Sequence, residues 1–207
     1  MTFSLVKHNN NSISAITSPG QLAQGKMTLL QTQTASSSAS ISFTSNIDST
    51  YPIYMFKFIN CHPATDSAEF TFQSDTGTNT NYNQTITSTM FTANHKEDDS
   101  ETGLGYFSAF DQAQGTSFQN LQTNLSNDSD NGVSGTLHLF DPSSSTFVKH
   151  FIANTQSFQP DGSTRLSHNH FTAGYFNTTT ALTRFQFKMS SGNIDSGTIK
   201  LYGIKGS

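Results

Sequence analysis

Histidine is the residue type in this chain whose chemistry works nearest neutral pH, and two pairs of histidines are spaced to act together. His168 and His170 alternate along a predicted strand, so both imidazoles lie on one face at a spacing that a metal ion can use. His138 and His150 lie on the two strands of one predicted hairpin, where they could approach each other. No cysteine pair and no H-E-x-x-H motif supports a zinc site. We expect polar surface or interface histidines and no cofactor, with His168 and His170 as the candidate metal ligands.

The spacing Asp128-x-Asp130-x-Gly132 is similar to half of a calcium-binding loop. An EF-hand loop requires glycine at position 6 and a bidentate glutamate at position 12. Counted from Asp128, these positions hold Val133 and Leu139. The EF-hand interpretation therefore fails, and a looser calcium site in a turn stays open.

Two polar loops hold the candidate recognition residues. Glu97, Asp98 and Asp99 belong to a dense charge cluster, a pattern that usually marks a solvated loop tip and that can also bind a cation or a basic partner. Tyr82 and Asn83 end another loop rich in Thr and Asn. We predict that these five residues belong to surface-recognition loops.

The sequence lacks the usual arrangements for catalysis. Catalytic carboxylate pairs need rigid elements that hold them about 5 to 10 Å apart, whereas the acids of this chain cluster in predicted loops. No G-x-S-x-G motif and no phosphate-binding glycine loop occurs. Six tyrosines could stack on sugars, but the chain has no tryptophan, which favours an aromatic core and oligomer contacts. We expect a protein that is not an enzyme.

The composition combines an uncharged polar surface with an aromatic core. Charged residues make up 12% of the 207 residues, about half the usual share, while Ser, Thr, Asn and Gln together make up roughly two fifths. The 18 Phe and 6 Tyr argue against disorder. Flat faces of hydroxyl and amide groups are typical of β-sheet proteins in large assemblies.

The charge distribution also limits the partners and the compartment. Lys and Arg form no cluster, so nucleic-acid binding is not expected. No apolar run is long enough to span a bilayer, and the first residues lack the apolar segment of a signal peptide. Because Cys61 is the single cysteine, no disulfide forms within the chain, and we expect folding in a cytosol.

Alternating apolar residues and turn signals predict about ten short strands. Three hairpins are expected: residues 51–61 with 68–73, residues 135–140 with 146–153, and the closing segment 181–205. Residues 51–61 are apolar on both faces, which predicts a central strand covered on both sides. Residues 117–125 have apolar residues at helical spacing, which allows a short helix there. Gly174 could mark a β-bulge. Further strands are expected at residues 26–34, 39–44, 84–92 and 165–176.

These elements predict an all-β protein, a jelly-roll-like antiparallel β-sandwich. We expect an N-terminal arm at residues 1–25, with at most a short strand at residues 3–6, followed by a single domain at residues 26–207. In an oligomer such an arm can lie on a neighbouring subunit.

The closing segment has an aromatic strand, an SSGN turn and a G-x-I-x-L-Y-G strand. The residues that carry this pattern are Phe185-Gln186-Phe187-Lys188, Ser191-Gly192-Asn193-Ile194 and Gly197-Thr198-Ile199-Lys200-Leu201-Tyr202-Gly203-Ile204. It resembles a C-terminal motif of structural proteins from tailed bacteriophages, notably marine phages that infect cyanobacteria. The runs SGTLHLF at residues 134–140, followed by PSS at residues 142–144, and AGYF at residues 173–176 are similar to the same group, and the resemblance extends over residues 26–207.

The resemblance implies a virion component and brings no catalytic residues with it. We expect a non-enzymatic structural protein that self-associates, as a homo-oligomer such as a trimer, and attaches to other virion proteins such as the major capsid protein. A capsid decoration protein is the first expectation. The alternative is a tail or fibre component that binds a host-surface receptor or glycan. In either case the protein would be assembled in the host cytoplasm and reside in the virion.

Overall fold

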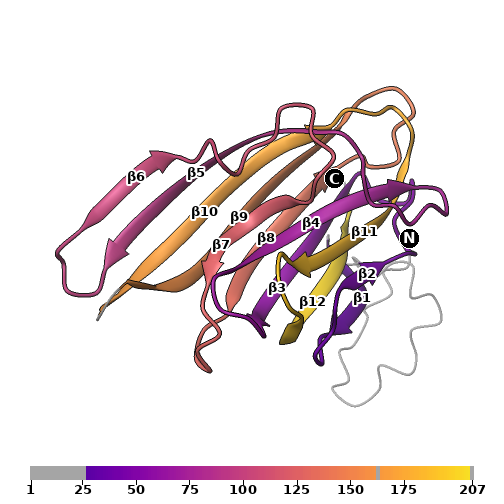
Figure 1. The fold of residues 1–207 in the computed structure, drawn as a ribbon. Coiled ribbons are helices and arrows are strands. Elements are labelled where there is room, and N and C mark those ends of the chain that lie inside the picture. Colours follow the sequence, from indigo (N-terminus) through magenta and orange to yellow (C-terminus); the bar gives the residue numbers. More distant parts are fainter. Residues whose placement is uncertain (1–26, 162–163, 206–207) are drawn as a thin grey trace, which may run out of the picture.

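The computed structural model describes residues 27–161 and 164–205, which form β-strands and no helix. Twelve strands build two antiparallel sheets in a sandwich-like arrangement (Figure 1). The all-β prediction is confirmed. The strands are β1 (Met27–Thr34), β2 (Ile41–Phe43), β3 (Ile53–Pro63), β4 (Ala68–Thr76), β5 (Ile86–Lys96), β6 (Thr102–Tyr106), β7 (Gln119–Leu125), β8 (Val133–Phe140), β9 (Lys149–Asp161), β10 (Thr164–Phe176), β11 (Leu182–Met189) and β12 (Ile194–Ile204).

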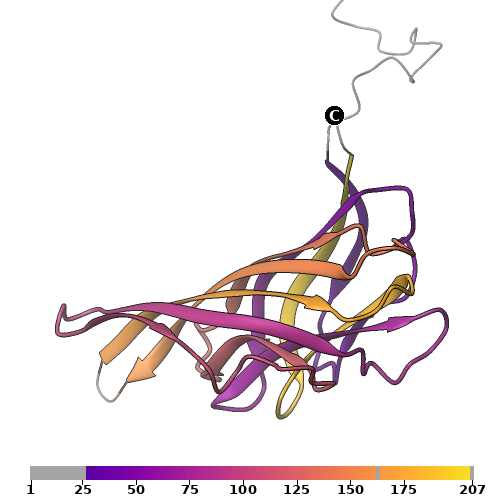
Figure 2. The same ribbon diagram turned by 90° about the horizontal axis from the view of Figure 1, so that it is seen from above.

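The two sheets differ in size. The larger has the strand order β1-β12-β3-β8-β9-β10-β5-β6, and the smaller has the order β2-β11-β4-β7. β10, β5 and β6 extend the larger sheet beyond the smaller one, at the left of Figure 1, and we call these three strands the wing. Seen from above, β1 and β12 run in a clearly different direction from β5 and β10, so the larger sheet is strongly twisted (Figure 2).

A cluster of phenylalanines between the sheets forms the core. Phe187 of β11 is fully buried at its centre. Its ring centroid lies 4.9–6.2 Å from those of five others: Phe43, Phe56, Phe58, Phe70 and Phe72. Edge-to-face pairs dominate, as the ring quadrupoles favour. The alternation of Phe185, Phe187 and Met189 along β11 predicts this buried face correctly.

One of the three expected hairpins is present, and two are corners of the sandwich. β8 pairs with β9 as the sequence predicts. β3 and β4 lie in opposite sheets, and so do β11 and β12. Two alternating strands joined by a short polar turn have the same sequence pattern in two arrangements. The strands can pair side by side in one sheet, or they can lie opposite each other across the core. In both cases here, the apolar faces of the two strands pack into the core between the sheets: Phe58 meets Phe70 edge to face, and Phe187 of β11 and Leu201 of β12 are both fully buried.

Three local expectations are wrong. The short helix that the apolar spacing of residues 117–125 allows does not form: residues 119–125 are strand β7, whose Leu121 and Leu125 are buried in the sandwich. β3 is central but covered on one side only, since Lys57 on its other face is exposed. Gly174 lies in a ladder without a register shift. It is needed instead because a Cβ there would lie 2.5 Å from the carbonyl oxygen of Thr87.

The expected arm at residues 1–25 and the short strand at residues 3–6 lie outside the described residues. The charge cluster of Glu97, Asp98 and Asp99 lies in a short loop, because β5 and β6 form a hairpin that leaves only residues 97–101 at its tip.

Candidate functional site

The outer face of the larger sheet turns away from the smaller sheet and carries an uncharged row of side chains across seven strands. Its residues, in order of pairing, are Leu29, Tyr202, Met55, His138, Ile152, Ala173 and Thr89. Leu29 and Ile152 are half exposed, at 50% and 52%. The smaller sheet packs on the opposite face of the larger one, so no other strand of the described residues covers this row.

Two exposed phenylalanines extend this surface onto the wing. Phe91 of β5 and Phe171 of β10 are opposite each other in the ladder, and their rings stack with centroids 4.9 Å apart. Their exposed fractions are 43% and 39%. Tyr106 of β6 continues the row on the far side of Phe91. We call Phe91, Phe171, Ile152 and the seven-strand row together the outer apolar face.

Two depressions lie on the outer apolar face. One of ≈ 410 Å³ is bordered by Ile152, His150 and Tyr175. A smaller one of ≈ 110 Å³ lies between Ile152, Phe91 and Phe171. Ile152 borders both, so the two form one continuous uneven surface. Sequence reasoning missed this surface; the available signal was apolar residues on the strand faces opposite to the core.

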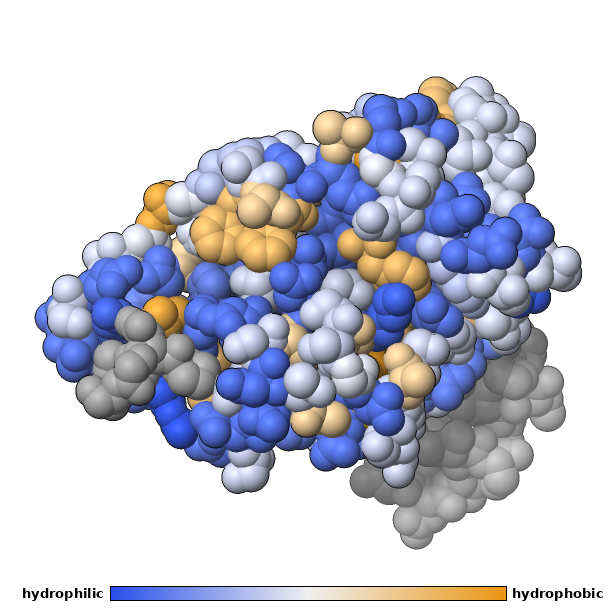
Figure 3. Space-filling model, viewed as in Figure 1, coloured by the Kyte–Doolittle hydropathy of each residue, from blue (hydrophilic) through white to orange (hydrophobic). Residues whose placement is uncertain are grey.

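The opposite side of the molecule differs in character. Figure 3 shows the face that bears the smaller sheet, which is largely hydrophilic with separate small apolar patches. Isolated patches of that size are ordinary on soluble proteins.

His138 and His150 both lie on the outer face but do not face each other. His138 is opposite Ile152 in the β8–β9 ladder, while His150 is opposite Tyr175 in the β9–β10 ladder. Burial lowers the pKa of His138, which favours the neutral imidazole. The strand register therefore makes His138 and His150 diagonal neighbours on one face, two positions away from direct opposition.

His168 and His170 share one face of β10 as predicted, but that face is the inner one. Their Nε2 atoms are 3.1 Å apart and both rings are buried. Burial lowers the pKa of both residues, to about 3 for His170. The ring of Phe107 packs edge to face against the imidazole of His170, with the ring centroids 6.3 Å apart. The two imidazoles are therefore neutral near neutral pH, and they are buried on the inner face of the wing under the ring of Phe107.

A cavity of ≈ 330 Å³ with a mixed lining lies beside His168, bordered by Glu69, Asn124 and Gln159 and by the rings of Phe107 and Phe110. Burial raises the pKa of Glu69. Within residues 27–161 and 164–205, no three His, Cys, Asp or Glu side chains are grouped so that they could hold a metal ion. Among the described residues, neither Glu69 nor any other acidic, cysteine or histidine side chain therefore completes a three-ligand metal site with the histidine pair.

The acidic candidates lie at the tip of the β5–β6 hairpin. Glu97, Asp98 and Asp99 are all exposed. Hydrogen bonds from Ser100 lower the pKa of Asp98, and His95 Nε2 lies 3.0 Å from Asp99 Oδ1. These contacts order the tip, and the carboxylates remain in contact with solvent.

The two residues of the other predicted recognition loop differ in exposure. Asn83 is exposed, but Tyr82 is only 6% exposed, so its ring is not part of a recognition surface here. Tyr82 has a φ of 47°, and its N–H donates to Asp75 Oδ2 at 2.9 Å. Asp75 is itself buried, and this bond satisfies one of its oxygens.

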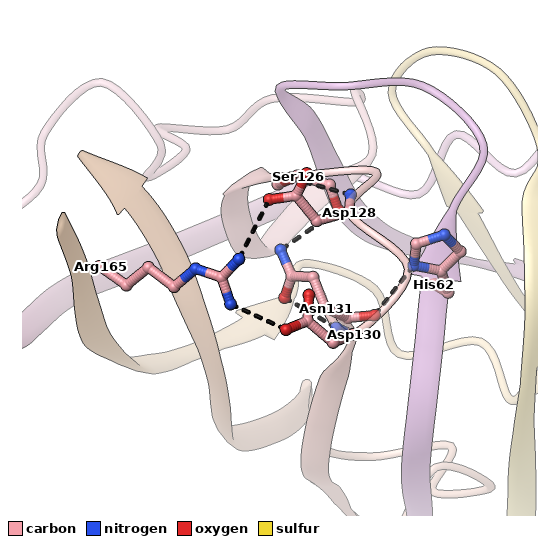
Figure 4. A network of polar contacts seen from close by, with 7 residues as sticks. His62, Ser126, Asp128, Asp130, Asn131 and Arg165 are labelled. Carbon is pink, nitrogen blue, oxygen red and sulfur yellow. Dashed lines mark hydrogen bonds and ion pairs between the residues drawn. The ribbon is translucent and has the colours of Figure 1, made fainter. Parts of the chain in front are cut away.

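The candidate calcium turn instead holds a guanidinium group. Arg165 of β10 binds Asp130 Oδ2 at 2.8 Å and lies 3.9 Å from Asp128 Oδ2 (Figure 4). The same turn receives His62, whose Nδ1 is 2.9 Å from the carbonyl oxygen of Asn131. Because a carbonyl only accepts, Nδ1 carries a proton and donates it to this carbonyl. A polar depression of ≈ 510 Å³ lies beside this network.

Cys61 is buried near the end of β3. Burial raises the pKa of its thiol to about 12, so the thiolate that reacts or binds metal does not form near neutral pH.

Comparisons with protein-family models, with curated proteins and with solved structures found no match to this chain. Among the described residues, no helix is long and apolar enough to cross a membrane.

Proposed function

We propose that this protein is a non-enzymatic structural component of a tailed-phage particle, which self-associates and decorates the capsid surface. The resemblance of the closing segment to phage structural proteins supports the particle assignment. That segment builds β11 and β12, which lie at the centre of the smaller sheet and inside the larger one.

The strand order supports a jelly-roll interpretation. Four neighbouring strands of the larger sheet have the order β1-β12-β3-β8, and the smaller sheet has the order β2-β11-β4-β7. Together these eight strands have the order of two interleaved Greek keys. On this interpretation, the hairpins β5–β6 and β9–β10 are insertions that widen one sheet. The jelly roll occurs in many viral capsid domains, although a fold alone does not establish a function.

The outer apolar face is the observation that carries the proposal. Stacked, half-exposed Phe91 and Phe171 beside Ile152 form an apolar surface on a chain with few charges. Aromatic residues are enriched and charged residues are depleted at the cores of protein interfaces. We infer that copies of this chain, assembled for example as a trimer on a three-fold site, bury this face against each other or against the major capsid protein.

An interface of this kind should resist salt, because it contains few ion pairs for salt to screen. Particles washed in 1 M NaCl are expected to retain the protein, measured by quantitative gel analysis of pelleted particles. The variant Phe171→Asn should reduce the retained amount at least about tenfold, equivalent to roughly 1.4 kcal/mol of binding.

The variant Phe147→Asn is the matched control, since Phe147 is 70% exposed in the loop before β9, outside the outer apolar face. It should be retained like the unmodified protein. Release of the unmodified protein by 1 M NaCl, or equal retention of all three proteins, would contradict the proposal.

A second candidate is a tail or fibre component that binds a host-surface receptor or glycan. The polar depression beside His62 favours it, because the Asn131 carbonyl holds the imidazole by its Nδ1 beside exposed Asp195 and Ser196. Hydroxyl-rich sugars bind such groups. Binding of the purified protein to host-cell envelopes that is lost in His62→Phe would favour this function over decoration.

A further inference from the structure

The four edge strands of the two sheets are protected to different degrees. β2 is only three residues long, and the ladders of β1 and β7 contain register shifts. Short edges and irregular edges hinder pairing with another strand. β6 has neither protection: it is five residues long and pairs with β5 without a shift.

The sequence of β6 also lacks the usual blocking residues. It reads TGLGY, with no charge and no proline. Leu104, at its centre, is 77% exposed, and Tyr106 is 57% exposed. An uncharged, regular and apolar edge is the kind of strand that pairs with another chain.

The hydrogen bonds at the two ends of the β5–β6 ladder show which way β6 presents its main chain. At one end, Lys96 N–H donates to the carbonyl of Glu101 at 2.9 Å. At the other end, Phe107 N–H donates to the carbonyl of Met90 at 2.9 Å. Hydrogen-bonded and non-bonded pairs alternate in an antiparallel ladder, so residues 101, 103, 105 and 107 point their main-chain groups toward β5.

The intervening residues therefore point their main-chain groups outward. Thr102, Leu104 and Tyr106 each direct an N–H and a C=O to the outer edge of the sheet, where no other strand of the described residues pairs with β6. These three residues are spaced symmetrically about Leu104. A second β6 placed antiparallel about a two-fold axis at Leu104 would exchange about six N–H···O bonds with the first.

We propose that two copies of this chain join through β6, pairing antiparallel about a two-fold axis at Leu104 and continuing the larger sheet from one copy into the next. The two Leu104 side chains then lie opposite each other, and Thr102 of each copy lies opposite Tyr106 of the other. This arrangement covers the exposed apolar side chains and satisfies the free main-chain groups together.

The charges of the hairpin tip favour the antiparallel direction. Glu97, Asp98, Asp99 and Glu101 lie at the hairpin tip just before β6, where Lys96 pairs with Glu101 and the net charge stays negative. In a parallel pair the two acidic tips would lie side by side and repel each other. In the antiparallel pair they lie at opposite ends of the contact, so the acidic tips select one orientation.

This inference deepens the proposed self-association and rests on it. It differs from burial of the outer apolar face, because it uses the edge of the sheet. A two-fold contact through β6 adds to a ring of subunits and would link one ring to the next.

The first experiment removes the outward N–H of residue 104. Leu104→Pro costs no bond to β5, because Leu104 does not point its main chain toward β5. The mass of the assembly, measured by light scattering, should fall by half relative to the unmodified protein, with the thermal midpoint of the subunit unchanged. The matched variant Leu104→Ala keeps the N–H and should retain most of the assembly.

The second experiment tests the register directly. Opposed residues in a hydrogen-bonded antiparallel pair have Cα atoms about 5.5 Å apart, within the range of a disulfide. Leu104→Cys should form an intermolecular disulfide under mild oxidation. Thr102→Cys should not, because its two copies would lie about 14 Å apart, and buried Cys61 does not compete.

The outcomes separate the two proposals. If the unmodified chain does not self-associate, or if Leu104→Pro leaves its mass unchanged and the two cysteine variants cross-link equally, the β6 contact is wrong. If Leu104→Pro leaves the mass unchanged but Phe171→Asn lowers it, the β6 contact is wrong and the proposed self-association through the outer apolar face is still supported. Selective cross-linking at residue 104 supports the β6 contact even if Leu104→Pro fails to fold.

Discussion

His168 and His170 occupy the positions that the alternation of the strand predicts, on one face of β10. The alternation does not say which face is buried, and here it is the inner one, under Phe107. Tyr82 shows the same limit, because a loop position in the sequence becomes a buried ring in the fold. At the scale of single residues, the sequence therefore identifies candidates, and burial by distant segments decides their chemistry.

The burial of His170 predicts how stability depends on pH. Its pKa falls from its ordinary value of 6.5 to about 3 in the folded chain. Below pH 6.5 the unfolded chain therefore binds a proton that the folded chain does not bind. His170 therefore does not reduce the free energy of unfolding above pH 6.5. Below pH 6.5 the free energy of unfolding should decrease as pH falls toward 3, by about 1.4 kcal/mol per pH unit for this group.

Urea denaturation at pH 7, 6 and 5 measures this slope. The variant His170→Gln should have a smaller loss of stability between pH 7 and pH 5 than the unmodified protein. His150→Gln, on the exposed side of β9, is the control and should leave the slope unchanged. A slope that is the same in all three proteins would show that His170 is not a buried neutral group.

At the scale of elements, the alternating pattern predicts most strands within a few residues, because period 2 reports one buried face. The pairing of the strands is less predictable. The turns after β3 and β11 read as hairpins, but each joins strands in opposite sheets. β7 was the hardest strand to predict, since Leu121 and Leu125 fit the spacing of a helix as well as that of a strand.

Gly174 provides a test of the packing of β10 between its neighbours. A Cβ at this position would lie 2.5 Å from the carbonyl oxygen of Thr87 and 2.9 Å from Ser88 Cα, both main-chain atoms. Gly174→Ala should therefore lower the free energy of unfolding by about 1–3 kcal/mol, measured by urea denaturation.

Gly105 of β6 is the matched control for this substitution. A Cβ there meets no atom within 4 Å, so Gly105→Ala should change stability by less than about 0.5 kcal/mol. Equal effects of the two substitutions would mean that β10 does not approach β5 as closely as described.

At the scale of the whole molecule, the arrangement of the sheets creates the two surfaces on which the account depends. The wing exists because β5, β6 and β10 join the larger sheet and extend past the smaller one (Figure 1). Phe91 and Phe171 come together from strands about eighty residues apart in the chain. No local pattern predicts that meeting, so the sequence indicates a sandwich with an uncharged surface but not the place of its interfaces.

The most direct test of the central claim is an electron cryo-microscopy map of the intact particle into which this chain is fitted. We predict density for the chain on the capsid lattice, with the outer apolar face against a neighbouring protein. Density at the tail tip or on a fibre would contradict decoration. Density on the capsid with the outer apolar face open to solvent would contradict the assigned interface.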